Sequence, residues 1–165
     1  MNFDLTEEQQ LLADSLKRYL ANEYSIDKRA KIVESAAGWS EAVWAAFAEM
    51  GLLGVPFAEE HGGFGGTAVD VMLVMEALGE GLVVEPYWVN VGLAGRLVAR
   101  AGSEAQQKRI LPGLIQGKQR LAFAHTERTA RYDLGHVGRG RSGPARAMRS
   151  RGRSGRCWPG APPIP

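Results

Sequence analysis

The stretch LAFAHTERTARYD, from Leu121 to Asp133, is where the pattern of the chain changes. Upstream of it, apolar residues recur at helical spacing. Within it, a short apolar run leads through Phe123 and His125 to a hydroxyl and a carboxylate at Thr126-Glu127. We interpret it as a strand that leaves a helical body, and we expect any chemical site of the chain at this junction.

The residues before this stretch predict a series of helices, most of them opened by a capping residue. Thr6 with Gln9 and Ser103 with Gln106 form capping boxes, in which side chains at both positions bond backbone N–H groups. Glycines stand where several helices should stop. The expected helices run from Thr6 to Glu23, from Ser25 or Asp27 to Ala36, from Ser40 to Gly51, from Thr67 to Gly81, from Pro86 to Gly102 and from Ser103 to Gly117.

Each expected helix carries an apolar stripe, so an all-α body is the predicted fold class. The predicted inward residues are Leu12, Leu16, Tyr19, Leu20, Ile32, Val33, Val43, Trp44, Phe47, Met50, Val71, Val74, Met75, Leu78, Leu93, Leu97, Val98, Ile110, Leu111, Leu114 and Ile115. Residues 52–66 are expected to be a loop-like connector. We divide the chain into a helical domain of about six helices (1–120), the start of a β-domain (121–137) and an irregular tail (138–165).

Charge separates the tail from the body. Residues 1–133 contain 13 Lys and Arg and all 18 Asp and Glu, whereas residues 134–165 contain 7 Arg and no acid. The tail also holds 7 Gly and 5 Pro with only scattered apolar residues, which is too little to build a strand pair. One interpretation is a nucleic-acid-binding tail on a non-catalytic helical domain, since Arg and Gly segments neutralise phosphates without folding. Only Trp158 offers a ring for base stacking, and the acidic body opposes the attraction.

A second alternative is a dinucleotide site at the glycine cluster. Residues 63–68, from Gly63 to Ala68, fit the permissive G-x-G-x-x-A form and open a helix, and a strand at Leu82–Val84 would place Glu85 near a ribose. Against this, the first glycine should directly follow a buried strand. The preceding Leu52–Val55 is short, is broken by Gly54 and is separated from Gly63 by several residues. A tight turn between helices is the simpler interpretation.

Other classes of site have little support in the spacing of residues. His61, His125 and His136 show no metal-ligand spacing with one another or with Cys157, so we predict no metal site. No catalytic triad or dyad can be argued, and no catalytic residue is assigned. The single cysteine excludes a disulfide framework within the chain, and neither a secretory signal nor a membrane span is visible. We expect a cytoplasmic protein that does not enter a membrane.

Taken together, the motifs resemble the N-terminal helical domain of the acyl-CoA dehydrogenase family. No single motif is specific, but their order and spacing over about 130 residues are. The sequence around Gly38-Trp39-Ser40 and at residues 126–133 is most similar to that of the small subunit of pimeloyl-CoA-type dehydrogenases. The matching motifs are Leu5-Thr6-Glu7-Glu8-Gln9, Gly51-Leu52, Glu60-His61-Gly62-Gly63, Glu76-Ala77-Leu78-Gly79, Gly102, Gln107-Lys108 before Leu111-Pro112, Gly117 and Ala124-His125-Thr126-Glu127.

The resemblance implies FAD as cofactor and an acyl-CoA, fatty or dicarboxylic, as substrate. In such enzymes a carboxylate removes the α-proton while the β-hydride passes to the flavin, which gives a trans-2-enoyl-CoA. Carried over by position, the resemblance assigns cofactor binding to Phe123, His125 and Thr126, and substrate binding to Tyr132. A strand end offers backbone N–H and C=O groups, and a threonine hydroxyl can both donate and accept a hydrogen bond.

Two departures from the family pattern bear on activity. The glycine turn that usually follows Thr-Glu is replaced here by the bulkier Arg128–Tyr132. The expected β-domain, and the later helical domain with the catalytic base, are not seen after residue 137. We therefore expect an apparently truncated chain that is inactive alone, whose tail is out-of-frame translation of a GC-rich gene from about Gly138. Expected partners are further copies or other acyl-CoA dehydrogenase subunits and an electron-transfer partner.

Overall fold

The structure, a computed structural model, describes residues 4–123, 133, 141–142 and 149–150. The chain forms two compact units, Met1–Leu121 and Ala122–Pro165, and each is described by itself. The first unit is a body of helices. The described part of the second consists of residues 122–123 and 133 and two very short strands.

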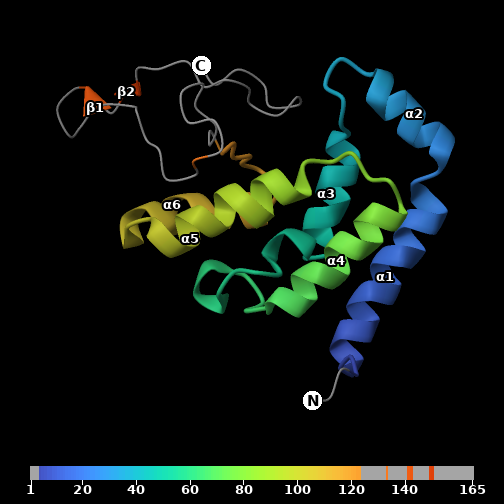
Figure 1. The fold of residues 1–165 in the computed structure, drawn as a ribbon, viewed down its shortest axis with the longest axis horizontal. Helices are drawn as coiled ribbons and strands as arrows, with labels where there is room; N and C mark the ends of the chain where they lie inside the picture. Colours follow the sequence, from blue (N-terminus) through green and yellow to red (C-terminus); the bar gives the residue numbers. More distant parts are fainter. Residues whose placement is uncertain (1–3, 124–132, 134–140, 143–148, 151–165) are drawn as a thin grey trace. The chain divides into compact units, whose positions relative to one another are not determined.

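The described residues of the first unit form helices joined by turns and no strand, which confirms the all-α prediction (Figure 1). Helix α1 packs beside α4, α3 lies against the short turn η1, and α5 packs beside α6. The helices are α1 (Glu7–Glu23), α2 (Ile26–Glu34), α3 (Glu41–Glu49), α4 (Ala68–Glu80), α5 (Arg96–Ala101) and α6 (Glu104–Ile115), with 3₁₀ turns η1 (Leu52–Gly54) and η2 (Glu59–His61) and a π-helix η3 (Trp88–Gly95).

Side-chain caps set where these helices begin, as the sequence predicts. Thr6, Thr67 and Ser103 each form a reciprocal capping box, and Ser25 and Ser40 each accept a hydrogen bond from a backbone N–H of the first turn. Each cap satisfies a donor that the helix cannot pair internally, which typically stabilises by about 1 kcal/mol.

The Thr67 box also changes the acidity of its partner. Burial of Asp70 opposes ionisation, but hydrogen bonds from the Thr67 hydroxyl and backbone N–H outweigh it and hold the pKa of Asp70 below its ordinary value. The carboxylate is therefore well matched to the positive end of α4.

Each of the α-helices and η3 contributes buried apolar residues to the core except α5, whose Val98 and Ala99 pack against it partly buried, and most of the predicted stripes are confirmed. Two inward predictions are wrong: Val33 is 49% exposed and Leu97 is 48% exposed. The most deeply buried side chains are Tyr87, Phe47, Phe57, Leu16, Leu52, Leu53, Leu111, Leu114, Val43, Val74 and Val91.

The error at Leu97 has a physical cause in η3. We predicted one regular helix from Pro86 to Gly102, but Trp88–Gly95 is a π-helix that continues into α5. A π-helix has more residues per turn than an α-helix, so it rotates the residues that follow it relative to a 3.6-residue pattern. Val91 and Ala94 consequently face the core, and Leu97 does not.

Residues 52–66 form turns and irregular backbone around η1 and η2, which confirms the expectation of a loop-like connector, but its first part, residues 52–57, belongs to the core, whereas most of residues 58–66 are exposed. Leu52, Leu53, Val55 and Phe57 are all buried. Tight backbone hydrogen bonds fold the connector on itself, including Gly65 N–H to Phe57 C=O at 2.7 Å.

The dinucleotide-binding interpretation is wrong. Leu52–Gly54 forms a 3₁₀ turn, and Leu82–Val84 is not a strand, so neither of the required strands exists. The glycines instead allow neighbouring backbone segments to approach closely. A Cβ on Gly63 would lie 2.1 Å from the Phe57 carbonyl oxygen, and one on Gly66 would lie 2.6 Å from the Val55 carbonyl oxygen.

In the second unit, β1 (Arg141–Ser142) pairs antiparallel with β2 (Arg149–Ser150). This corrects the expectation that the tail is too poor in apolar residues for a strand pair. The ladder joins only two residues of each strand, Arg141 with Ser150 and Ser142 with Arg149. The strand predicted to start at residue 121 has no counterpart in residues 121–123, and residues 124–132 lie outside the described residues.

The glycine contacts make a direct prediction about stability. We expect Gly63→Ala to lower the free energy of unfolding by about 2–3 kcal/mol, because the added methyl meets backbone rather than a yielding side chain. Gly79→Ala is the matched control: nothing lies within 4 Å of its Cβ, and alanine favours the helix by about 0.5–1 kcal/mol. Urea unfolding of both variants measures the difference, and equal stabilities would contradict the close packing.

Candidate functional site

The structure places only one of the predicted site residues. Phe123 is half-buried and lies outside any helix. The proposed flavin contacts His125 and Thr126, and the proposed substrate contact Tyr132, lie outside the described residues. What the structure does describe is how the helical body holds the chain just before this segment.

After α6 the chain turns back sharply. Gly117 adopts a left-handed conformation with φ 72°, and the N–H groups of Lys118 and Gln119 both donate to the Gly113 carbonyl. These bonds close the end of α6 in the manner of a Schellman motif. The turn directs the chain away from the helix axis toward Leu121.

A buried amide side chain binds the backbone at that point. The Asn90 side chain, 3% exposed, accepts a hydrogen bond from the Leu121 backbone N–H at 2.6 Å. Its Nδ2 donates to the Pro86 carbonyl at 3.1 Å, one turn earlier. The amide is therefore satisfied on both sides and held in one orientation. Sequence reasoning missed Asn90, although an amide in the apolar run from Val89 to Val98 is a usable signal.

Arg120, the residue before Leu121, is held by a different contact. The Arg120 guanidinium lies 4.1 Å from the centre of the buried Trp39 ring. Such a stacked cation contributes about 0.5–1 kcal/mol at an exposed position. Leu121 itself packs against the core. The stacked cation of Arg120, together with the half-buried side chain and the bonded N–H of Leu121, thus fixes the end of the first unit.

A second polar network lies just before the start of η3. The carboxylate of Glu85, 6% exposed, accepts a hydrogen bond from the Tyr24 hydroxyl at 2.8 Å and from the Ser40 backbone N–H at 3.2 Å. The Tyr24 oxygen in turn accepts from the Val84 N–H at 3.2 Å. The network joins the ends of α1 and α4 to the start of α3. Sequence reasoning considered Glu85 only as a ribose ligand and missed this role.

The same network sets the acidity of Tyr24. Burial is the largest cause, and the hydrogen bond to the Glu85 carboxylate adds to it, so that the pKa of Tyr24 is raised to about 12. The neutral phenol is the form that can donate to Glu85. The burial of Tyr87 raises the pKa of that phenol as well, and its hydroxyl donates to the Leu52 carbonyl at 3.0 Å.

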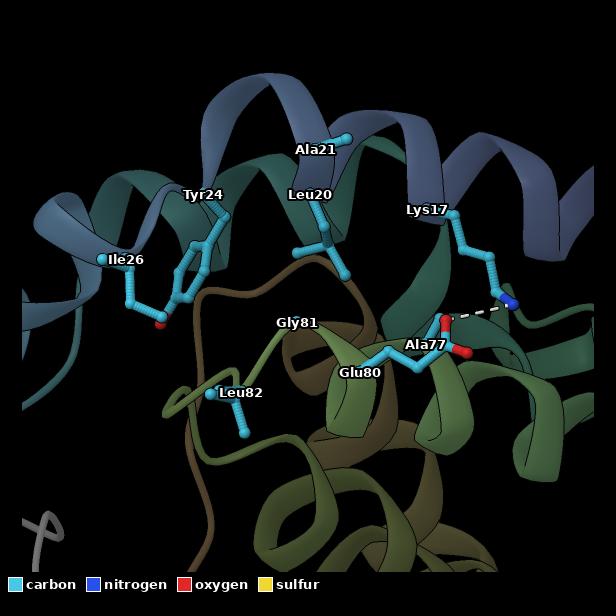
Figure 2. Close-up of a pocket in the computed structure, with 9 residues that line it drawn as sticks. All are labelled: Lys17, Leu20, Ala21, Tyr24, Ile26, Ala77, Glu80, Gly81 and Leu82. Atoms are coloured by element: carbon cyan, nitrogen blue, oxygen red, sulfur yellow. Dashed lines mark ion pairs between the residues drawn. The ribbon is translucent and has the colours of Figure 1, made fainter.

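A shallow hollow lies between α1 and α4 beside this network (Figure 2). Tyr24 and Leu20 line it, and the ion pair of Lys17 with Glu80, at 3.1 Å, closes one side. Leu82 stands at its edge with φ 49°, a left-handed conformation that is unusual for leucine. The Arg29 side chain donates to the Leu82 carbonyl at 2.7 Å and so supports this conformation.

The remaining buried polar groups do not assemble into a chemical site. His61 Nδ1 and Trp44 Nε1 are buried without a hydrogen-bond partner among the described residues. In the part of the chain that is described, no three His, Cys, Asp or Glu side chains gather as metal ligands would. None of the described helices is long and apolar enough to cross a membrane.

Solved structures with the same helical arrangement define the class of fold. The ChsE4–ChsE5 complex from Mycobacterium tuberculosis superposes with a TM-score of 0.77 at 23% identity, over 92% of this chain and 40% of that one. An acyl-CoA dehydrogenase complexed with FAD from Bacillus anthracis gives a TM-score of 0.72 at 24% identity, over 82% of this chain and 23% of that one. The body is thus an acyl-CoA dehydrogenase N-terminal helical fold.

The family follows from the sequence comparison. Residues 6–118 match the model of the acyl-CoA dehydrogenase N-terminal domain, and the chain belongs to the acyl-CoA dehydrogenase family. The acyl-CoA dehydrogenase FadE12 of Mycobacterium tuberculosis is 36% identical over 132 residues. That alignment covers 76% of this chain and 32% of FadE12, so the chain spans about a third of the length of this relative.

The Tyr24–Glu85 bond predicts a dependence of stability on alkaline pH. Tyr24→Phe removes the donor to a buried carboxylate, so we expect it to lower the free energy of unfolding by about 1–3 kcal/mol at neutral pH. Because the folded pKa of about 12 exceeds the ordinary tyrosine pKa of 10.0, this contribution is complete below pH 10 and is lost as pH rises through 12. Urea unfolding of both proteins from pH 8 to 12 should show their difference shrinking; a constant difference would contradict it.

Proposed function

We propose that this chain is the N-terminal part of an FAD-dependent acyl-CoA dehydrogenase, an oxidoreductase that converts an acyl-CoA thioester to the trans-2-enoyl-CoA. The family match over residues 6–118 carries the proposal. The helical body described above supports it, since the same fold occurs in the FAD complex from Bacillus anthracis. The acyl group is fatty or dicarboxylic, the latter in keeping with the resemblance to pimeloyl-CoA-type small subunits.

The proposed cofactor contacts are Phe123, His125 and Thr126. In a helix, backbone N–H and C=O groups at these positions would be used by bonds along the helix. Residues 121–123 lie outside any helix, and the cofactor role of Phe123, His125 and Thr126 is carried over from the family resemblance. The Thr126 hydroxyl would add a group that both donates and accepts.

The chemistry divides between cofactor and protein. FAD, when bound, supplies the acceptor for the β-hydride of the acyl chain. The residues of this chain would bind and orient: main-chain groups near Phe123 and the Thr126 hydroxyl hold the ring edge, and Tyr132 lies toward the substrate. The base that removes the α-proton is supplied from outside this chain in our proposal.

Assembly follows from the same proposal. The chain would act with further copies or with other acyl-CoA dehydrogenase subunits, and would pass electrons to a separate electron-transfer partner in the cytoplasm. The ChsE4–ChsE5 neighbour is itself a complex. Large apolar side chains that are exposed in the isolated chain, including Phe64, Met72 and Trp88, are compatible with such contacts.

The proposal predicts that the chain alone does not turn over substrate but that its body works in a complete enzyme. With FAD, a panel of acyl-CoA thioesters and an artificial electron acceptor, we expect no dehydrogenation by the 165-residue chain. A graft in which residues 1–133 replace the matching residues of FadE12 should retain flavin and dehydrogenate at least one thioester.

Two outcomes would contradict the proposal. Turnover by the 165-residue chain would show that the base is not missing. A graft that folds, as judged by circular dichroism and size-exclusion chromatography, yet holds no FAD would reject this body as part of a flavin enzyme. Unaltered FadE12, purified in parallel, is the control for flavin retention and rate.

A further inference from the structure

We propose that Asn90 is a positioning residue for the flavin segment: its buried amide fixes the backbone at Leu121, from which the segment carrying Phe123, His125 and Thr126 starts. This inference rests on the proposed function. Asn90 touches neither cofactor nor substrate in it and acts only through the main chain. The claim concerns the point of departure of the segment and is therefore carried by contacts within the first unit alone.

The hydrogen bond to Leu121 replaces a missing main-chain partner. After α6 ends at Ile115 and the chain turns at Gly117, Leu121 belongs to no helix or strand that could pair its N–H. Leu121 packs against the core, where an unpaired N–H costs about 1–3 kcal/mol. Asn90 Oδ1 meets that N–H at 2.6 Å. No apolar residue at position 90 could do this.

The orientation of the amide is fixed as well. Nδ2 donates to the Pro86 carbonyl at 3.1 Å, so the oxygen has to face Leu121. A rotated amide would set its NH₂ group against the Leu121 N–H and its oxygen against the Pro86 carbonyl, and both contacts would repel. The side chain consequently works as a two-ended bridge between the start of η3 and the end of the first unit.

The helix that carries Asn90 has little freedom to shift. A Cβ on Gly95 would lie 2.6 Å from a Leu114 methyl carbon and 2.7 Å from the Phe57 ring, so η3 approaches α6 and the connector closely. The π-helical turn is itself a feature that recurs at functional sites. On the other side, Arg120 is stacked on Trp39. Leu121 is thus held between two well-packed elements.

Such precision matters because a hydrogen-bonded cofactor edge tolerates displacements of only about 0.5 Å. Thr126 lies five positions after Leu121 in the sequence, so an error in the placement of Leu121 is passed on to the residues that follow it. Loss of the Asn90 bridge should therefore weaken flavin binding more than an equal loss of stability elsewhere would.

The test compares three substitutions. Asn90→Leu keeps the approximate volume and removes both hydrogen bonds. Asn90→Asp keeps the acceptor for Leu121 and, as the neutral acid that burial favours, also keeps a donor for the Pro86 carbonyl, so it is the conservative rescue. Tyr87→Phe is the matched control, because it removes another buried hydrogen bond from the start of the same helical region, that to the Leu52 carbonyl, without touching Leu121.

Two measurements follow. In the 165-residue chain, hydrogen exchange of the Leu121 amide should be about tenfold faster in Asn90→Leu, and unchanged in Asn90→Asp and Tyr87→Phe. In the FadE12 graft, the Kd for FAD should rise about fivefold to tenfold in Asn90→Leu and stay within about twofold in the other two, with the flavin absorbance bands shifted in Asn90→Leu alone.

The inference would be overturned if the Leu121 amide exchanged as slowly in Asn90→Leu as in the unaltered chain. It would also be overturned if Tyr87→Phe lost as much FAD affinity as Asn90→Leu. A graft that binds no FAD with Asn90 intact would instead reject the proposed function, and with it the flavin part of the inference. Exchange at Leu121 would then still decide whether Asn90 fixes the backbone.

Discussion

The helical body depends on one constraint: backbone groups that a helix end leaves unpaired must find partners before they can be buried. The chain meets it with short polar side chains at the starts of helices and with a few buried polar residues where segments cross. Thr6, Thr67 and Ser103 act locally, within one turn. Glu85 and Asn90 act over long distances in the sequence and join segments that would otherwise end without partners.

This difference in range explains what could be predicted from the sequence. Caps and apolar stripes are local patterns, so the helix starts at Thr6, Ser40 and Ser103 follow from neighbouring residues. The burial of the connector from Leu52 to Phe57 depends on what lies around it, and no local pattern shows that. The π-helical turn likewise has no sequence period of its own, which is why Leu97 was placed on the wrong face.

The candidate site likewise contains residues that local motifs predict and one residue that they do not. Sequence motifs alone predict the acyl-CoA dehydrogenase family, and the match of residues 6–118 to the family model confirms it. The assignment of Phe123, His125 and Thr126 to cofactor binding stays a prediction. The residue that holds the preceding backbone, Asn90, lies 31 positions from its partner. Such a pairing becomes visible only when the fold brings η3 beside the end of the body. Local motifs can indicate which residues bind a cofactor, whereas the residues that position them have to be found in the three-dimensional structure.

The π-helix Trp88–Gly95 also has a consequence for how the gene can vary. Successive residues of an α-helix are about 100° apart around its axis, so loss of one codon within this segment would tighten it and turn everything downstream. Arg96–Ala101 and the approach to α6 would then present other faces to the core. Codon insertions and deletions should thus be far better tolerated in the turn before Trp39 than here, because that turn ends one helix before the next begins.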